Sequence, residues 1–136
     1  MVFREDTAAV AQGNTITDNG NIGVQVCGTT APSLAGNVIS GAGQYGVLYL
    51  DAGAGTVAGN TVTGFQLGVQ LSGYAAPTVT GNVLGQQALA AIAYAEASAG
   101  PVSANNCTNP AVPGIVVAAS ANPAVGENQC TIARLT

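Results

Sequence analysis

Carboxylates are the first groups in this sequence to consider for chemistry, because the chain contains no histidine. Six acidic residues stand against two basic ones, Arg4 and Arg134. Asp51 and Glu96 are the one candidate for a catalytic pair, since they take equivalent positions in the repeat described below. Neither has a basic partner nearby in that repeat, and lone surface carboxylates are usually no more than solvated side chains. The sequence therefore favours a non-catalytic protein.

Cysteines are the second candidate groups, and there are three of them, Cys27, Cys107 and Cys130. Without histidine and without a Cys-x-x-Cys pair, the usual kinds of zinc site are excluded. Calcium takes roughly six to eight oxygen ligands, several of them carboxylates, and the acids here are scattered along the chain. We expect neither a metal nor a cofactor.

The composition limits the partners. Only 6% of the residues are charged and the net charge is −4, so the clustered Lys and Arg that attract nucleic acid or an anionic membrane surface are missing. No apolar run reaches the roughly 18 residues of a membrane helix, and the charged residues at positions 4–6 interrupt any signal region. We expect no nucleic acid and no membrane as partners. The compartment stays open, with an extracytoplasmic or cell-surface location preferred.

A short motif of the form Gly-Asn-x-Ile/Val-x recurs through the chain. Its asparagines follow one another at steps of 23, 23, 22, 23 and 23 residues, at Asn14, Asn37, Asn60, Asn82, Asn105 and Asn128. Each repeat contains three short pieces of alternating apolar residues, bounded by Gly, Pro, Asn and Asp. Such pieces are typical of short strands. Three strands per repeat of about 23 residues predict a solenoid in which each coil pairs with its neighbours.

The period distinguishes between two solenoids. A left-handed β-helix built from three hexapeptides per coil has a period near 18 residues, whereas about 23 residues with unequal turns favours the right-handed parallel β-helix. We therefore predict an all-β, right-handed parallel β-helix of about six coils. Residues 1–136 form a single domain, with 1–11 as an N-terminal arm or partial first coil and 132–136 as a C-terminal tail. Uncapped terminal coils favour a fragment of a longer β-helix or a protein that self-associates.

One asparagine per coil has a mechanical explanation. The corner between two strands needs a residue that tolerates left-handed backbone angles, and stacked amides can hydrogen-bond from coil to coil. We interpret the six asparagines as a structural ladder and not as binding residues.

The Gly-Asn-x-Ile-x and Gly-Val-x-Val pieces, spaced by 22 to 23 residues, resemble the right-handed β-helix repeat superfamily. That superfamily includes pectate-lyase-like enzymes, alginate epimerases and NosD-type proteins. The resemblance covers about residues 11–131 and implies the fold. It also implies, as an alternative function, binding, cleavage or epimerisation of a polysaccharide.

The repeat places the candidate residues in space. Asp51 and Glu96 share one position two coils apart, about 10 Å at the usual strand spacing, which is at the far edge of the ~6.5–9.5 Å range of inverting glycosidases. Cys107 and Cys130 share an inward position in adjacent coils, about 5 Å apart, so that a disulfide and buried free thiols are both possible.

Two surface rows could bind a partner. The first is nearly free of charge and consists of Gln25, Leu48, Gln70, Ala93 and Val116. The second, rich in Thr, resembles the flat rows of ice-binding solenoids. We expect a non-catalytic scaffold or interaction module that self-associates through the first row or through open coil ends. The partner is then a second copy or the rest of a longer chain. The alternatives are a polysaccharide-directed β-helix and an ice-binding solenoid.

Overall fold

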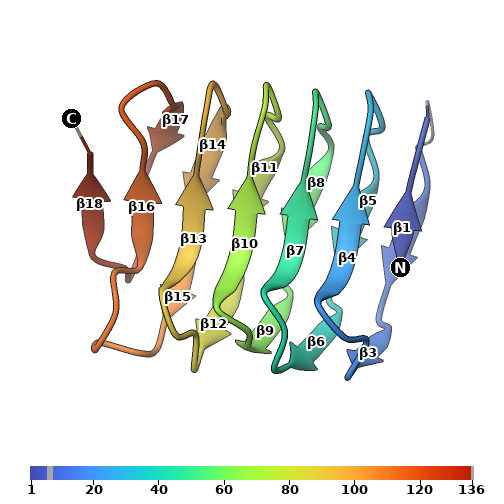
Figure 1. Ribbon diagram of the computed structural model, residues 1–136, viewed down its shortest axis with the longest axis horizontal. Helices are drawn as coiled ribbons and strands as arrows, with labels where there is room; N and C mark the ends of the chain where they lie inside the picture. Colours follow the sequence, from blue (N-terminus) through green and yellow to red (C-terminus); the bar gives the residue numbers. More distant parts are fainter. Residues whose placement is uncertain (6–7, 136) are drawn as a thin grey trace.

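The computed structural model describes residues 1–5 and 8–135, and within these ranges the chain forms strands joined by turns. Three parallel sheets wrap into one solenoid (Figure 1), which confirms the predicted right-handed β-helix. No helix in the described part of the chain is long and apolar enough to cross a membrane.

Each coil contributes one strand to each sheet in turn. The seven-stranded sheet contains β1 (Val2–Phe3), β4 (Ile22–Val26), β7 (Tyr45–Tyr49), β10 (Leu67–Leu71), β13 (Ala90–Tyr94), β16 (Ile115–Val117) and β18 (Ile132–Arg134). The six-stranded sheet contains β2 (Val10–Gln12), β5 (Ser33–Ala35), β8 (Thr56–Ala58), β11 (Thr78–Thr80), β14 (Ala99–Ser103) and β17 (Asn122–Val125). The five-stranded sheet contains β3 (Thr15–Thr17), β6 (Val38–Gly41), β9 (Thr61–Gly64), β12 (Val83–Gly85) and β15 (Asn106–Cys107).

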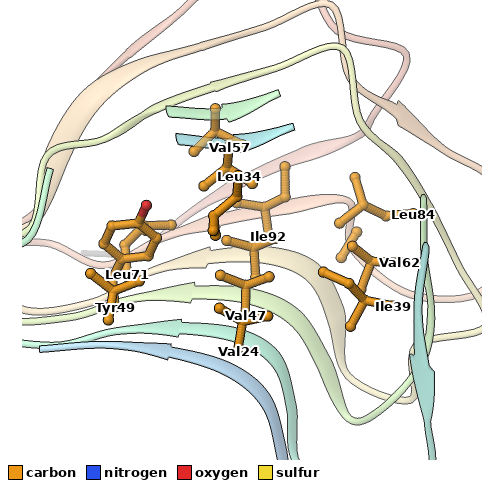
Figure 2. Packing of buried hydrophobic residues seen from close by; sticks show 14 of the residues in the cluster. Val24, Leu34, Ile39, Val47, Tyr49, Val57, Val62, Leu71, Leu84 and Ile92 are labelled. Carbon is orange, nitrogen blue, oxygen red and sulfur yellow. The ribbon is translucent and has the colours of Figure 1, made fainter. Parts of the chain in front are cut away.

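Side chains of similar size stack on one another inside the solenoid. Ile39, Val62 and Leu84 are aligned partners in the five-stranded sheet and are fully buried. Figure 2 shows this stack beside the separate stacks of the other two sheets. Because equivalent residues lie one strand spacing, about 4.8 Å, apart, each aliphatic side chain packs between its equivalents in the adjacent coils. This explains why the inward position of the five-stranded sheet is aliphatic from β3 to β12.

Glycine at the start of the seven-stranded sheet follows from the same packing. A Cβ on Gly46 would lie 2.6 Å from Cγ1 of Val62 and 2.6 Å from the carbonyl oxygen of Gly68. The corner between the five-stranded and seven-stranded sheets therefore has no space for a Cβ at Gly46 or at Gly68 without a shift of its neighbours, and the equivalent position in β13 carries only the small Ala91.

The asparagines form a continuous ladder at the corner between the six-stranded and five-stranded sheets. Oδ1 of Asn60 accepts hydrogen bonds from the backbone N–H of Asn37 at 2.9 Å and from its Nδ2 at 3.0 Å. Nδ2 of Asn60 donates to the carbonyl of Leu34 at 3.0 Å and to Oδ1 of Asn82 at 3.0 Å. The same pattern extends from Asn14 to Asn128.

The coil that leads into β18 is shorter than the others. Ile92 and Ile115 are aligned neighbours 23 residues apart, whereas Ile115 and Ile132 are aligned neighbours only 17 apart. The chain passes from Cys130 almost directly to β18, close enough that a Cβ on Gly114 would lie 2.7 Å from Cβ of Cys130. Cys130 is joined to Cys107 by a disulfide with the Cα atoms 5.0 Å apart.

This shortcut changes one expectation from the sequence. Residues 132–134, predicted as part of a C-terminal tail, form the strand β18. Their pairing with β16 aligns Arg134 with the buried Val117. The spacing of the asparagines does not reveal the contracted coil, because the shortening lies after the last asparagine, Asn128.

We predict that Asn60→Leu destabilises the protein by roughly 3 kcal/mol or more. The substitution leaves the buried backbone N–H of Asn37 and one N–H of its Nδ2 without the acceptor that Oδ1 of Asn60 provides, at roughly 1–3 kcal/mol for each unsatisfied group. The measurement is the free energy of unfolding from denaturant titration followed by circular dichroism. Asn14→Leu is the matched control. Asn14 is exposed at one end of the ladder, so the same change should cost under about 1 kcal/mol. Equal losses at both positions would contradict a ladder that depends on burial.

Candidate functional site

The carboxylates of Asp51 and Glu96 lie at corners that follow strands of the seven-stranded sheet. Both residues have left-handed backbone angles, with φ of 60° and 54°. Oδ2 of Asp51 accepts a hydrogen bond from the N–H of Gly28 at 3.0 Å, and Oε1 of Glu96 accepts one from the N–H of Gly73 at 3.3 Å. Each carboxylate therefore ties its corner to the preceding coil.

These two acids do not form a catalytic pair in this geometry. Gly73 lies between them, because the N–H of Tyr74 donates to the carbonyl of Asp51 while the N–H of Gly73 donates to Glu96. The two carboxylates are thus two strand spacings apart, about 10 Å. Among the described residues, no group of three or more His, Cys, Asp or Glu side chains is placed to hold a metal ion.

The tyrosines that could have faced such acids lie inside the solenoid. Tyr49 and Tyr94 are buried, and their hydroxyls have no hydrogen-bond partner among the described residues. Burial raises the pKa of both hydroxyls well above the usual value. A sugar outside the solenoid would meet the carboxylates but not these rings, so the carboxylates and these two tyrosines do not line one groove.

A hollow lies at the β18 end of the solenoid. It measures about 790 Å³ and is lined by Asn105, Asn128, Glu127 and Ile132 among others. Its position follows from the contracted coil, which leaves the last corner uncovered beside β18. The hollow is part of the uneven end of the solenoid, and neither of the predicted catalytic residues, Asp51 and Glu96, lines it.

The outer side of the seven-stranded sheet is the remaining candidate surface, and we call it the outer face. Its first row is Ile22, Tyr45, Leu67 and Ala90. Its second row is Val2, Gln25, Leu48, Gln70, Ala93, Val116 and Ala133. Its third row follows the strand ends and consists of Arg4, Cys27, Leu50, Ser72, Ala95, Ala118 and Leu135. Arg4, at the β1 edge, is the one charged residue in these rows, and none of their members belongs to the interior cluster or packs against it.

The predicted binding row lies on this outer face, with one difference in exposure. Gln25, Gln70, Ala93 and Val116 are half-buried, whereas Leu48 is only 7% exposed. Leu48 lies between Gln25 and Gln70 in adjacent strands, and side chains in a flat parallel sheet cover one another. A charge at Leu48 would therefore perturb the free protein as well as any interface.

The two glutamines are held along their own strands. Nε2 of Gln25 donates to Sγ of Cys27 at 3.0 Å, and Nε2 of Gln70 donates to Oγ of Ser72 at 3.2 Å. These contacts reduce the polar character that the outer face presents to a partner.

The Thr-containing row on the five-stranded sheet is mixed. Its aligned members are Thr15, Val38, Thr61, Val83 and Asn106. Val38 is 46% exposed and Val83 is 40% exposed. The row is outward-facing, but it lacks an unbroken line of threonines.

A two-coil repeat was missed from the sequence. Residues 49–51 and 94–96 both read Tyr-x-acid, and they are 45 positions apart. Residues 26–28 and 71–73 both read aliphatic-x-Gly at the same separation. At this corner glycine and an acidic residue alternate from one coil to the next. The alternation has a steric cause, since a Cβ on Gly73 would lie 2.6 Å from the carbonyl oxygen of Asp51. Comparison at an offset of 45, instead of 23, would have found it.

The family model for the right-handed β-helix region matches residues 1–84 and 23–134. The chain belongs to the right-handed β-helix family. The two matched ranges overlap, as expected of a β-helix whose coils can be aligned in more than one register. Searches of curated proteins and of solved structures find no match.

We predict that Asp51→Asn changes stability by less than about 0.5 kcal/mol. The amide oxygen still accepts the Gly28 N–H, and asparagine tolerates the left-handed backbone. Asp51→Ala should cost about 1–2 kcal/mol, because alanine disfavours that backbone and cannot accept the bond. Thermal unfolding of both variants, compared with the wild type, is the measurement. A large loss on Asp51→Asn would mean that the negative charge itself is needed.

Proposed function

We propose that this β-helix is a non-catalytic scaffold that self-associates through the outer face of its seven-stranded sheet. The observation that carries the proposal is the absence of charge on the five central strands of that face together with their apolar content. In β4, β7, β10, β13 and β16 no residue is charged. An extended apolar sheet surface of this kind usually packs against another surface.

The alternative self-association through coil ends is less well supported. The three sheets contain seven, six and five strands, so the β18 end is stepped and cannot abut a flat surface. The outermost strand β18 places Arg134 in the register of the interior residue Val117. β17, the outermost strand of its own sheet, contains Pro123. Inward-placed charges and edge prolines are devices that prevent strands from pairing with other chains.

The size of the outer face predicts a weak complex. Seven strands at about 4.8 Å span about 29 Å, and five to six residues at about 3.3 Å span about 18 Å. Two copies packed on this face would bury roughly 1,000 Å² in total, near the lower limit for specific interfaces. Association should therefore depend on concentration.

The test measures mass in solution by light scattering after size exclusion, across a range of protein concentrations. We expect the wild-type mass to rise from monomer to dimer. Val116→Glu should weaken association at least about tenfold, because dimerisation would bury an unpaired carboxylate. Val83→Glu is the matched control, since Val83 lies on the outer side of the five-stranded sheet. It should behave as the wild type.

Two results would count against the proposal. One is a wild-type protein that remains monomeric at the highest concentration. The other is an equal effect of Val116→Glu and Val83→Glu, which would place the association elsewhere. Circular dichroism melts of both variants establish that each is folded.

A further inference from the structure

The outer face is uneven, and its large and small residues are segregated by strand. On the outer side, β7 and the residue after it carry Tyr45, Leu48 and Leu50, which we call the ridge. The equivalent positions of β13 and the residue after it are Ala90, Ala93 and Ala95, which we call the trough. β10 lies between them and pairs with both strands.

The difference in size is confined to the outer side. The inward residues of the same two strands match, with Val47 equivalent to Ile92 and Tyr49 to Tyr94, and all four are buried. Interior packing therefore does not require three large residues on β7 or three alanines on β13. The outward pattern calls for a separate explanation.

The division is weaker towards the ends of the sheet. β4 carries the outward residues Ile22 and Gln25 on the side of the ridge, whereas β16 and β18 carry Val116 and Ala133 on the side of the trough. On the trough side the third row also ends in Leu135, which is 55% exposed. The difference in size is therefore clearest between β7 and β13. A surface of this shape is complementary to a copy of itself turned end for end.

Resting on the self-association proposed above, we propose that a second copy packs on the outer face with its solenoid axis antiparallel, so that each ridge lies in the partner's trough. The two-fold axis then runs along the strand direction at β10. Ridge and trough each lie one strand spacing, about 4.8 Å, from that axis, so both contacts form at once. The interface is isologous, as in most homodimers.

The residue on the axis suits this symmetry. Gln70 lies in the middle row of β10, and its amide offers both a donor and an acceptor, so it can pair with the same group of the partner. Its Nε2 is already oriented by Ser72 at 3.2 Å.

The other face-to-face dimer has parallel solenoid axes and is disfavoured by shape. In that arrangement β7 faces β7 and β13 faces β13. Two ridges would then meet and hold the sheets apart, and the two troughs would leave a void between them. Close packing, which interfaces need as much as interiors do, is available to the antiparallel arrangement alone.

The experiment is a double-mutant cycle on the dimer dissociation constant, measured by sedimentation equilibrium. Ala95→Leu fills the trough and should weaken dimerisation about tenfold or more. Leu50→Ala removes part of the ridge and should also weaken it about tenfold. The double variant Leu50→Ala with Ala95→Leu exchanges large and small residues across the axis. We expect its dissociation constant to return to within about threefold of the wild type.

Both positions are half-buried on the outer side of the sheet, so the monomer should remain folded, and melting curves measure this directly. Thr61→Leu, on the outer side of the five-stranded sheet, is the control for added apolar surface and should leave the dissociation constant unchanged.

The outcomes separate the two proposals. Additive effects without recovery in the double variant, or tighter association on Ala95→Leu alone, would overturn the antiparallel arrangement while leaving the outer face as the interface. A wild-type protein that does not dimerise would overturn both.

Discussion

The stacking of equivalent residues in adjacent coils is the constraint on which the rest of this structure depends. The buried asparagine ladder maintains it, because each buried amide bonds to both its neighbours and also to a backbone carbonyl in the preceding coil, as Asn60 does to Leu34. A slip of one residue in any coil would break these bonds and would turn the inward side chains of that coil outward. The ladder and the aliphatic stacks therefore specify one register together.

This constraint acts on one side of each strand only. Inward positions must stay apolar and fit the side chains of the adjacent coils, as Val47, Val69 and Ile92 do in one row and Val26, Tyr49 and Leu71 do in the next. Outward positions have no such requirement, and there the chain varies from Leu48 to Ala93 within the same row. Variation on the outer face is thus where information about partners can be found, whereas the interior carries information about the fold. Because the interior carries information about the fold and not about partners, membership of a fold family does not by itself specify an activity.

The parts of the structure that could be predicted from the sequence are those that repeat. The asparagine spacing and the inward residues predicted the sheets, and the shared inward position of Cys107 and Cys130 placed them close enough for the disulfide that the structure contains. The parts that do not repeat could not be predicted. The contracted coil, the register of Arg134 and the low exposure of Leu48 each depend on contacts outside a single period. The corner function of Asp51 depends on Gly28 in the preceding coil, a pairing that appears only at a period of two coils.

The β18 end and the outer face have opposite physical characters, and this contrast bears on how the solenoid can associate. At the β18 end, a charged residue takes an interior register position and the disulfide holds a shortened coil beside it. A further strand paired there would bury Arg134 without a partner, which is costly in an apolar interior. On the outer face, the strands β4, β7, β10, β13 and β16 have no charge to bury. Packing of two copies on this face therefore avoids the cost that strand pairing between copies at β18 would carry.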